Sequence, residues 1–203
     1  MKYLLEHPAL VGTLLLQHLS LTFVSLGIAL AIAIPLGIFA TRKERAGTAI
    51  LGVLGAIYTV PSLALLALLV PFLGLGYPTA VTALAAYAQM ILVRNIVAGL
   101  RSVDPAQRDA ARGLGMTATQ TFFHVELPLA LPVMLGGVRL ALVSLIAIAS
   151  IAAWINAGGL GTLLFAGIQQ DNSEKIIAGS IAAGGLAICA DVVLRAIERA
   201  SRR

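Results

Sequence analysis

The chain has 203 residues, of which 59% are hydrophobic and 11% are charged. Soluble domains carry roughly 45–50% apolar and about 25% charged residues, so this composition excludes a soluble all-helical core and predicts a membrane protein. The formal net charge is +5, but the 14 basic residues form no aromatic-interleaved or helical patch of the kind that binds nucleic acid.

Several stretches are long and apolar enough to cross a membrane. Because the hydrocarbon core of a bilayer is about 30 Å thick, a spanning helix needs roughly 20 apolar residues. We therefore expect an all-α membrane protein with about five transmembrane helices, a single domain over residues 1–203. Residues 1–18 are expected to form a short interfacial helix before the first span. The expected spans cover residues 19–40, 49–73, 78–100, 129–154 and 176–197.

The distribution of basic residues predicts the orientation of the chain. They gather after the first span, between the third and fourth spans, and at the carboxyl end. With an odd number of spans these segments share one side, which the positive-inside rule assigns to the cytoplasm. We therefore expect the amino terminus outside and the carboxyl terminus inside. The residues concerned are Arg42, Lys43, Arg45, Arg101, Arg108, Arg112, Arg199, Arg202 and Arg203.

Neutral polar side chains lie near the middle of the second, third and fourth spans. Pro61 removes a backbone hydrogen bond, so we expect it to bend the second span and to free a carbonyl toward a cavity. A path lined in this way would pass a neutral or zwitterionic solute without a buried counter-charge. Ordinary interhelical hydrogen bonding is the other interpretation. The pathway candidates are Tyr58, Thr59, Ser62, Gln89 and Ser144.

Residues 101–128 form a polar segment between the third and fourth spans. Asp104 is a good N-cap and Pro105 suits the first helical position, so a surface helix is expected to begin here. It would run to about Arg112, and Gly113 and Gly115 would offer left-handed stops after it.

A second short helix is expected over residues 118–124, because Thr117 and Gln120 have the spacing of a capping box. The segment would then be a helix, a glycine turn and another helix, held on the cytoplasmic side by the spans at each end. Small residues on the first helix would let a partner surface approach its backbone closely.

The same segment resembles the cytoplasmic coupling motif of the permease subunits of ATP-binding cassette (ABC) importers. That pattern reads E-A-A, three residues, G, nine residues, I, one residue, L-P. The matching positions are Asp109, Ala110, Ala111, Gly115, Val125, Leu127 and Pro128, with Asp for Glu and Val for Ile as the only departures. The resemblance implies that this segment fits a cleft on a separate ATPase, whereas a solvated connector without a partner is the other interpretation. The expected ATPase-coupling residues are Asp109, Ala110, Ala111 and Gly115, with Arg108 and Arg112 as charges that fix orientation.

Four ionisable residues fall within or near the ends of the later spans. Arg94 and Arg139 lie toward the cytoplasmic ends, where long side chains reach the interface. Asp191 precedes Arg195 by four residues, the spacing of an ion pair on one helix, and could equally meet Arg94 or Arg139. Structural pairing and a role in the transport path both remain open.

The sequence carries no catalytic or metal site that we recognise. A phosphate-binding G-x-x-x-x-G-K-[ST] loop is missing from it. His7, His18 and His124 are scattered and lack the spacing of metal ligands. We expect no enzyme activity, no metal and no cofactor on this chain, with ATP and Mg²⁺ used by the partner ATPase.

Residues 154–169, between the fourth and fifth spans, are expected to face outward. Trp154 suits the interfacial aromatic belt. Three glycines permit a tight re-entrant or gating turn before a short helix, near where a binding protein would dock. These gate or loop candidates are Gly158, Gly159 and Gly161.

The Gly-Gly-Leu-Gly element resembles one shared by several importer permeases. Together with residues 59–71 and 176–180 it resembles the glycine betaine, carnitine and choline (osmoprotectant) permeases over nearly the whole chain. The resemblance implies the fold of type I ABC importers, like that of methionine permeases, in the bacterial cytoplasmic (inner) membrane. Implied partners are ABC ATP-binding subunits, a second permease copy or paralogue, and an extracytoplasmic solute-binding protein.

Two other functions fit the same residues. One is the permease subunit of a methionine or other amino-acid ABC importer. The other, from a different class, is a membrane scaffold or sensor that docks a cytoplasmic partner through residues 101–128.

Overall fold

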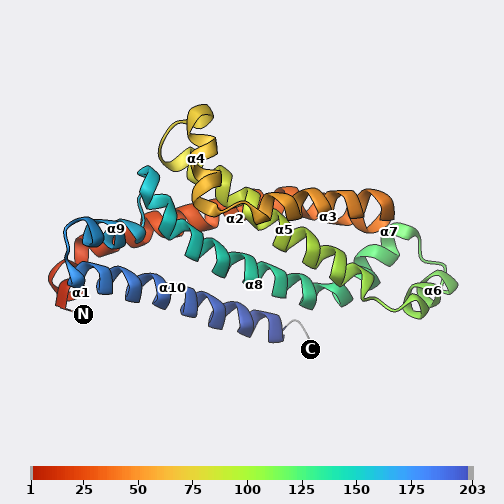
Figure 1. The fold of residues 1–203 in the computed structure, drawn as a ribbon. Helices are drawn as coiled ribbons and strands as arrows, with labels where there is room; N and C mark the ends of the chain where they lie inside the picture. Colours follow the sequence, from red (N-terminus) through yellow and green to blue (C-terminus); the bar gives the residue numbers. More distant parts are fainter. Residues whose placement is uncertain (1, 201–203) are drawn as a thin grey trace.

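The computed structural model describes residues 2–200, and this range folds into helices with no strand (Figure 1). Arg202 and Arg203, which belong to the expected cytoplasmic cluster, lie outside the described residues. The α-helices are α1 (Lys2–Glu6), α2 (Pro8–Arg42), α3 (Glu44–Thr59), α4 (Ser62–Leu73), α5 (Tyr77–Arg101), α6 (Pro105–Gly113), α7 (Ala118–Thr121), α8 (Leu127–Ala152), α9 (Gly161–Gln169) and α10 (Ser173–Ala200).

Helices α2, α5 and α8 form the centre of the molecule, with α5 packed between the other two (Figure 1). Of the long helices, α5 is the most buried and α10 the least. Small residues allow the close approach, since Ala29 and Ala33 of α2 are fully buried and Gly37 lies against Ile96 of α5. Helix α10 runs along α8 and leaves its other side exposed.

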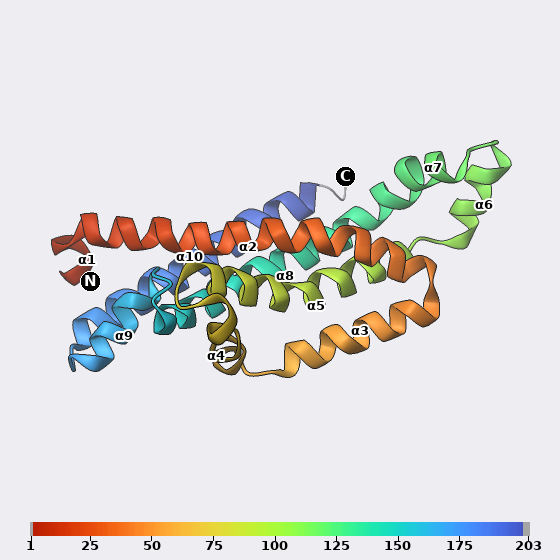
Figure 2. The ribbon, with the colours of Figure 1, turned by 90° about the horizontal axis from the view of Figure 1, so that it is seen from above.

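The expected second span is broken in two. Helices α3 and α4 meet at an angle of 96° (Figure 2). The break has a local cause, because Pro61 disfavours helical backbone at the residue before it, and Val60 is extended with ψ of 129°. Among the described residues, four helices can cross a membrane by length and composition, or five if this bent pair counts as one span.

The prediction for the start of the first span was wrong, whereas its end agrees with the end of α2 to within two residues. No separate interfacial helix covers residues up to His18, since α2 already begins at Pro8 and continues to Arg42, with only the short α1 before it. Pro8 starts α2 because a helix has no use for the N–H of its first residue.

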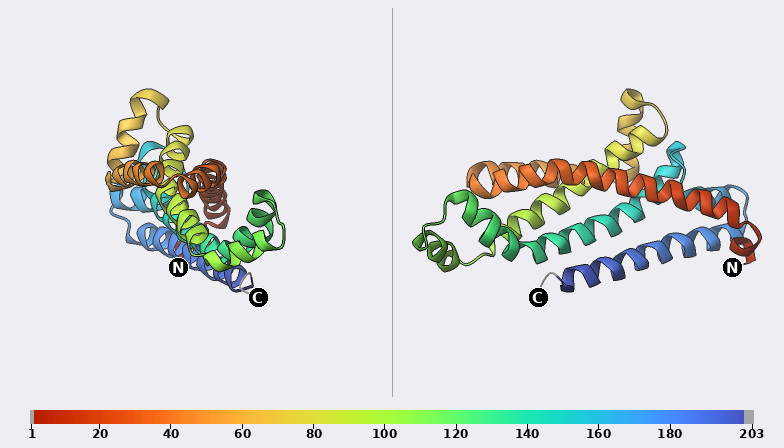
Figure 3. Two further views of the ribbon diagram at one scale, coloured as in Figure 1. Left: turned by 90° about the vertical axis from the view of Figure 1, so that its right-hand side faces the viewer. Right: turned by 180° about the vertical axis from the view of Figure 1, so that it is seen from behind.

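The polar segment lies at one end of the bundle and the turn before α9 lies at the other (Figure 3). Helix α6 projects beyond the ends of α2 and α5, as Figure 2 shows from above. Helix α9 and α1 lie at the opposite end, beside the start of α10 (Figure 1). The bundle therefore holds two functional candidates a full helix length apart.

Candidate functional site

The polar segment has the helix–turn–helix form that its sequence predicts. The Asp104 carboxylate accepts a hydrogen bond of 2.9 Å from the backbone N–H of Ala106, which caps α6. Gly115 then adopts a φ of +81°, where an L side chain is strained. A capping box joins Thr117 and Gln120 at the start of α7. The first predicted helix is thus confirmed. Of the two predicted left-handed stops, only Gly115 adopts that conformation, while Gly113 is the last residue of α6.

The second helix differs from the prediction. α7 ends at Thr121, and a π-helical turn over Phe122–Glu126 connects it directly to α8. The predicted separate helix over residues 118–124 is therefore wrong at its carboxyl end, because the chain has no break there. Pro128 does not interrupt the run, since it stands in the first turn of α8. α7, the π-helical turn and α8 therefore form one continuous helical run.

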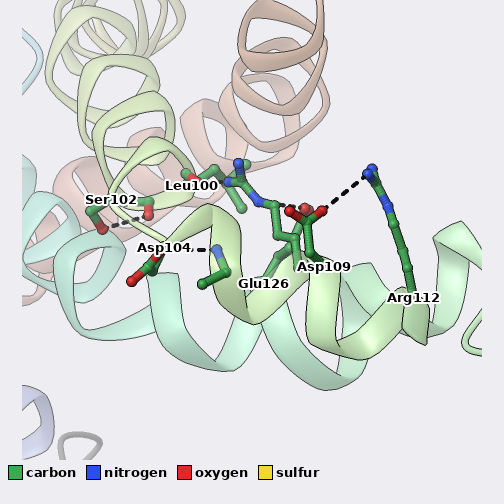
Figure 4. A network of polar contacts seen from close by, with 9 residues as sticks. Leu100, Ser102, Asp104, Asp109, Arg112 and Glu126 are labelled. Carbon is green, nitrogen blue, oxygen red and sulfur yellow. Dashed lines mark hydrogen bonds and ion pairs between the residues drawn. The ribbon is translucent and has the colours of Figure 1, made fainter. Parts of the chain in front are cut away.

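Arg108 binds the polar segment to the rest of the bundle through Leu100 and Glu126, both of which are labelled in Figure 4. Its Nε lies 2.9 Å from the Glu126 carboxylate, and its Nη2 donates a 2.6 Å hydrogen bond to the carbonyl oxygen of Leu100. One guanidinium therefore joins α6 to the last turn of α5 and to the helical turn before α8. Its side chain is only 27% exposed. This arrangement directs Arg108 toward α5 and Glu126.

The outward face of the segment is small and polar with an apolar tip. Asp109 and Arg112 form a 3.6 Å ion pair, and both side chains are more than 70% exposed. Ala110 is exposed as well, whereas Ala111 turns inward and is buried. Leu114, which the sequence reasoning missed, is 80% exposed at the tip. An apolar residue between two glycines was the available signal for it.

The turn before α9 is buried against α2 and α8. The Gly159 N–H donates a 3.0 Å hydrogen bond to the side-chain oxygen of Gln17. The Leu160 N–H donates to Nδ1 of His18 at 3.2 Å, and Nε2 of His18 donates to the carbonyl oxygen of Ile146 at 3.0 Å. The fully buried His18 ring therefore joins α2, α8 and the turn.

His18 was overlooked because its partners lie 128 and 142 residues away in the chain. The glycines themselves behave as predicted in conformation: Gly158 and Gly159 have φ of +80° and +84°, and Gly161 begins α9. Beside the turn, a cavity of about 430 Å³ lies between Trp154 and Phe165, whose rings meet edge to face at 5.3 Å.

The pathway candidates do not converge on one site. Tyr58, Thr59 and Ser62 lie together at the break between α3 and α4. The Tyr58 ring meets that of Tyr87 edge to face at 5.9 Å, and the Tyr87 hydroxyl donates to the carbonyl oxygen of Val60. The Val60 carbonyl is thus bonded to α5. The Ile57 carbonyl, whose helical donor is missing because residue 61 is proline, accepts instead from the Val60 N–H at 3.2 Å, so it is not free toward a cavity as expected.

Gln89 faces a different helix. Its Nε2 donates a 3.1 Å hydrogen bond to the carbonyl oxygen of Ala29 on α2, and the side chain is 7% exposed. It borders a mainly apolar cavity of about 270 Å³ between α2 and α5, lined also by Ile28 and Ile32. Ser144 lies half-buried on α8. Within this chain the polar candidates therefore occupy separate surfaces of the bundle.

An ion-pair network joins α8 to α10. Arg139 contacts Asp191 at 2.9 Å and Glu198 at 3.2 Å, and Asp191 also contacts Arg195 at 2.6 Å. Of the partners that the sequence left open for Asp191, the structure selects these two arginines, while Arg94 is exposed on α5. The charged residues of α8 and α10 are therefore accounted for as ion pairs that hold the two helices together.

Comparison with known proteins gives a consistent family. A family model described as binding-protein-dependent transport system inner membrane component matches residues 33–203. The chain is 39% identical to the osmoprotectant import permease protein OsmW of Salmonella typhimurium, over 97% of this chain and 94% of that protein. It is 38% identical to the carnitine transport permease protein OpuCB of Listeria monocytogenes, over 95% and 87%. It is 37% identical to the choline transport system permease protein OpuBB of Bacillus subtilis, over 90% and 84%.

Solved structures share the fold at lower sequence identity. A chain of the MetNI methionine ABC transporter in an inward-facing conformation matches with a TM-score of 0.86 at 22% identity, covering 97% of this chain and 99% of that one. A chain of an amino acid ABC transporter with histidines matches with a TM-score of 0.78 at 21% identity, covering 97% and 96%.

Proposed function

Since the chain belongs to the family of binding-protein-dependent transport system inner membrane components, we propose that it is the permease subunit of an importer for small quaternary ammonium osmoprotectants. It is a multi-pass subunit of an ABC importer in the bacterial inner membrane, and the family is one of permeases rather than of ATPases. The relatives' substrates, which include carnitine and choline, support this solute class. The observation that carries the proposal is the relatives' identity along nearly the whole chain.

The orientation follows from the charges. The exposed Arg42, Lys43 and Arg45 lie in and beside the turn between α2 and α3, at the same end of the bundle as α6. The positive-inside rule would put this end in the cytoplasm, with the amino terminus outside. The polar segment would then face the ATP-binding subunits, and the turn before α9 would face the solute-binding protein.

The outward face of α6 would dock into the ATPase. Asp109 and Arg112 are solvated and supply orientation, while the small Ala110 and the open Gly115 leave room for a close approach. ATP and Mg²⁺ would be used by that partner. Closing of the ATPase pair would push α6, and the Arg108 contacts would pass the displacement to α5 and α8.

The solute path would form between two permease subunits, either copies of this chain or this chain with a paralogue. Tyr58 and Thr59 support this arrangement because both are exposed at the break between α3 and α4 instead of lining an internal channel. With Ser62 they offer neutral hydrogen-bonding groups to a zwitterion. Gln89 and Ser144 are further candidates, and Gly158, Gly159 and Gly161 would hold the outer turn in place.

The test is reconstitution of this permease with its ATPase and binding protein in liposomes. We expect glycine betaine, carnitine or choline to stimulate ATP hydrolysis, and Ala110→Trp to abolish ATPase co-purification while membrane insertion persists. Thr48→Trp, at an exposed position on α3 outside the polar segment, is the matched control and should behave as wild type. Stimulation by methionine alone would point to an amino-acid importer, and ATPase binding without solute-dependent turnover would point to a scaffold.

A further inference from the structure

A cavity of about 310 Å³ lies beneath the polar segment, where α6 and α7 meet the last turns of α2 and α5. It adjoins the outward face that the proposed function assigns to the ATPase, and Arg112 belongs to both surfaces. Most of its lining is polar or charged, with an apolar wall toward the bundle. The lining residues are Ile38, Thr41, Arg42, Leu100, Arg108, Arg112, Ala118, Thr121, Phe122 and Glu126.

The charge of this cavity is positive, since three arginines face one glutamate across it. Glu126 is already paired with Arg108 at 2.9 Å, so it does not neutralise the other two arginines. Arg42 lies with its guanidinium carbon 5.6 Å from the centroid of the Phe122 ring, which holds it at the rim. Arg112 contacts Asp109 at 3.6 Å. Because both side chains are exposed to solvent, this ion pair is weak.

A buried hydroxyl gives the cavity a second mark of a binding site. Thr121 is 5% exposed and lines the cavity, and its Oγ1 has no hydrogen-bond partner among the described residues. A buried polar group without a partner costs roughly 1–3 kcal/mol, so an acceptor in the cavity would relieve that cost. Two available guanidinium groups and one hydroxyl are a donor set suited to phosphate oxygens.

The position of the cavity indicates where such a phosphate would come from. Thr41 and Arg42 end the first spanning helix, and Leu100 stands in the last turn of α5. In the orientation proposed above, the ends of spanning helices would lie at the level of the lipid phosphates on the cytoplasmic side, where basic pockets between spans bind anionic headgroups. We propose that the cavity binds a phosphate group, supplied by the headgroup of an acidic phospholipid, and thereby joins α2 to the polar segment.

The test is native mass spectrometry of the detergent-purified full-length permease titrated with phosphatidylglycerol or with phosphatidylcholine. We expect preferential retention of phosphatidylglycerol, weakened about fivefold in Arg42→Gln, the loss expected for one interfacial arginine. Arg45→Gln removes an exposed arginine three residues away that does not line the cavity, and should bind as wild type. Equal weakening in both variants, or in neither, would overturn the site.

Thr121→Val tests the hydroxyl with almost no change in shape, and should weaken retention roughly two- to tenfold. Inorganic phosphate forms the second arm. If it binds in an Arg42-dependent manner while phosphatidylglycerol does not, the lipid source is overturned and the phosphate site is kept. If Arg42→Gln loses co-purifying ATPase and keeps its lipid, the cavity receives an acidic side chain of that partner, and the proposal is wrong.

Discussion

Both ends of the helical bundle contain glycines with positive φ, but the steric surroundings of these glycines differ. At the polar end, Gly115 has a φ of +81°, and a β-carbon there would meet no described heavy atom within 4 Å. At the other end, Gly158 and Gly159 also have positive φ, but added β-carbons would lie 2.5 Å from Oε1 of Gln17 and 3.0 Å from Nδ1 of His18. The turn at Gly115 has a fixed backbone conformation and open space around it. The turn at Gly158 and Gly159 is instead packed against α2.

This difference indicates why a partner protein would push on the polar end of the bundle and not on the outer turn. The polar end exposes Asp109, Ala110 and Leu114, yet it is bound to α5 and α8 through Arg108. The outer turn instead places its polar groups inside, on His18. An open surface with a rigid attachment suits a partner that pushes, and a closed turn suits a fixed pivot.

Gly161→Ala should have the largest effect on stability. Its β-carbon would collide with the backbone carbonyl oxygen of Ser150, which cannot move without shifting α8. We expect a loss of about 3 kcal/mol or failure to fold, measured as the melting temperature or the yield of folded protein in detergent. Gly12→Ala, where the space is open, is the control. Equal melting temperatures for the two variants would mean that the outer turn is not closed.

His18→Leu should have the next largest effect on stability. It leaves the buried Leu160 N–H without its partner, at about 1–3 kcal/mol, whereas the Ile146 carbonyl keeps its contact with the Ser150 hydroxyl. His124→Leu changes an exposed histidine whose ring contacts only the nearby Gln120 carbonyl, so its melting temperature should stay near that of wild type. If the two variants have the same melting temperature, His18 does not hold the turn.

Asp191→Asn should lower the melting temperature by less than His18→Leu does, because the pair with Arg139 is partly exposed and Glu198 still faces that arginine. Thermal unfolding in detergent measures the loss. Asp171→Asn, at an exposed turn position, is the matched control. Unchanged unfolding combined with lost transport would assign Asp191 to the solute path instead of to helix packing.

Asp109→Asn should have the smallest effect on stability, within about 0.5 kcal/mol, because its pair with Arg112 is solvated. The affinity for the ATPase should nevertheless fall a few-fold, since the charge orients docking. Binding of the purified ATPase to permease in nanodiscs measures this. A clear loss of stability with unchanged ATPase affinity would make the outward face of α6 a structural element.

Local sequence was sufficient for most of the helices and for several of their ends, although not for the start of α2 or the end of α7. Apolar length predicted the spans, Asp104 and Thr117 predicted two helix starts, and Gly115 predicted a turn. These features depend on residues within one turn of each other, and tertiary packing did not override them. The bend at Pro61 followed from the same kind of local constraint.

The site contacts could not be predicted in the same way. His18 reaches Ile146 and Leu160 only after α2 has packed on α8, and nothing near it in the chain marks it. Arg108 looked like a contact for a partner, but the neighbouring Glu126 and the Leu100 carbonyl draw it inward. The direction in which a side chain points depends on which helix packs beside it, and the residues near it in the sequence do not specify that helix.

The most direct test of the central claim is the side of the membrane on which the polar segment lies. In a Cys189→Ala background, Leu114→Cys at the exposed tip should react with a membrane-impermeant maleimide in inside-out vesicles and be protected by bound ATPase. Gln169→Cys at the exposed end of α9 should react in intact cells. Labelling of Leu114→Cys from outside intact cells would contradict the account, because no ATPase could then reach this segment.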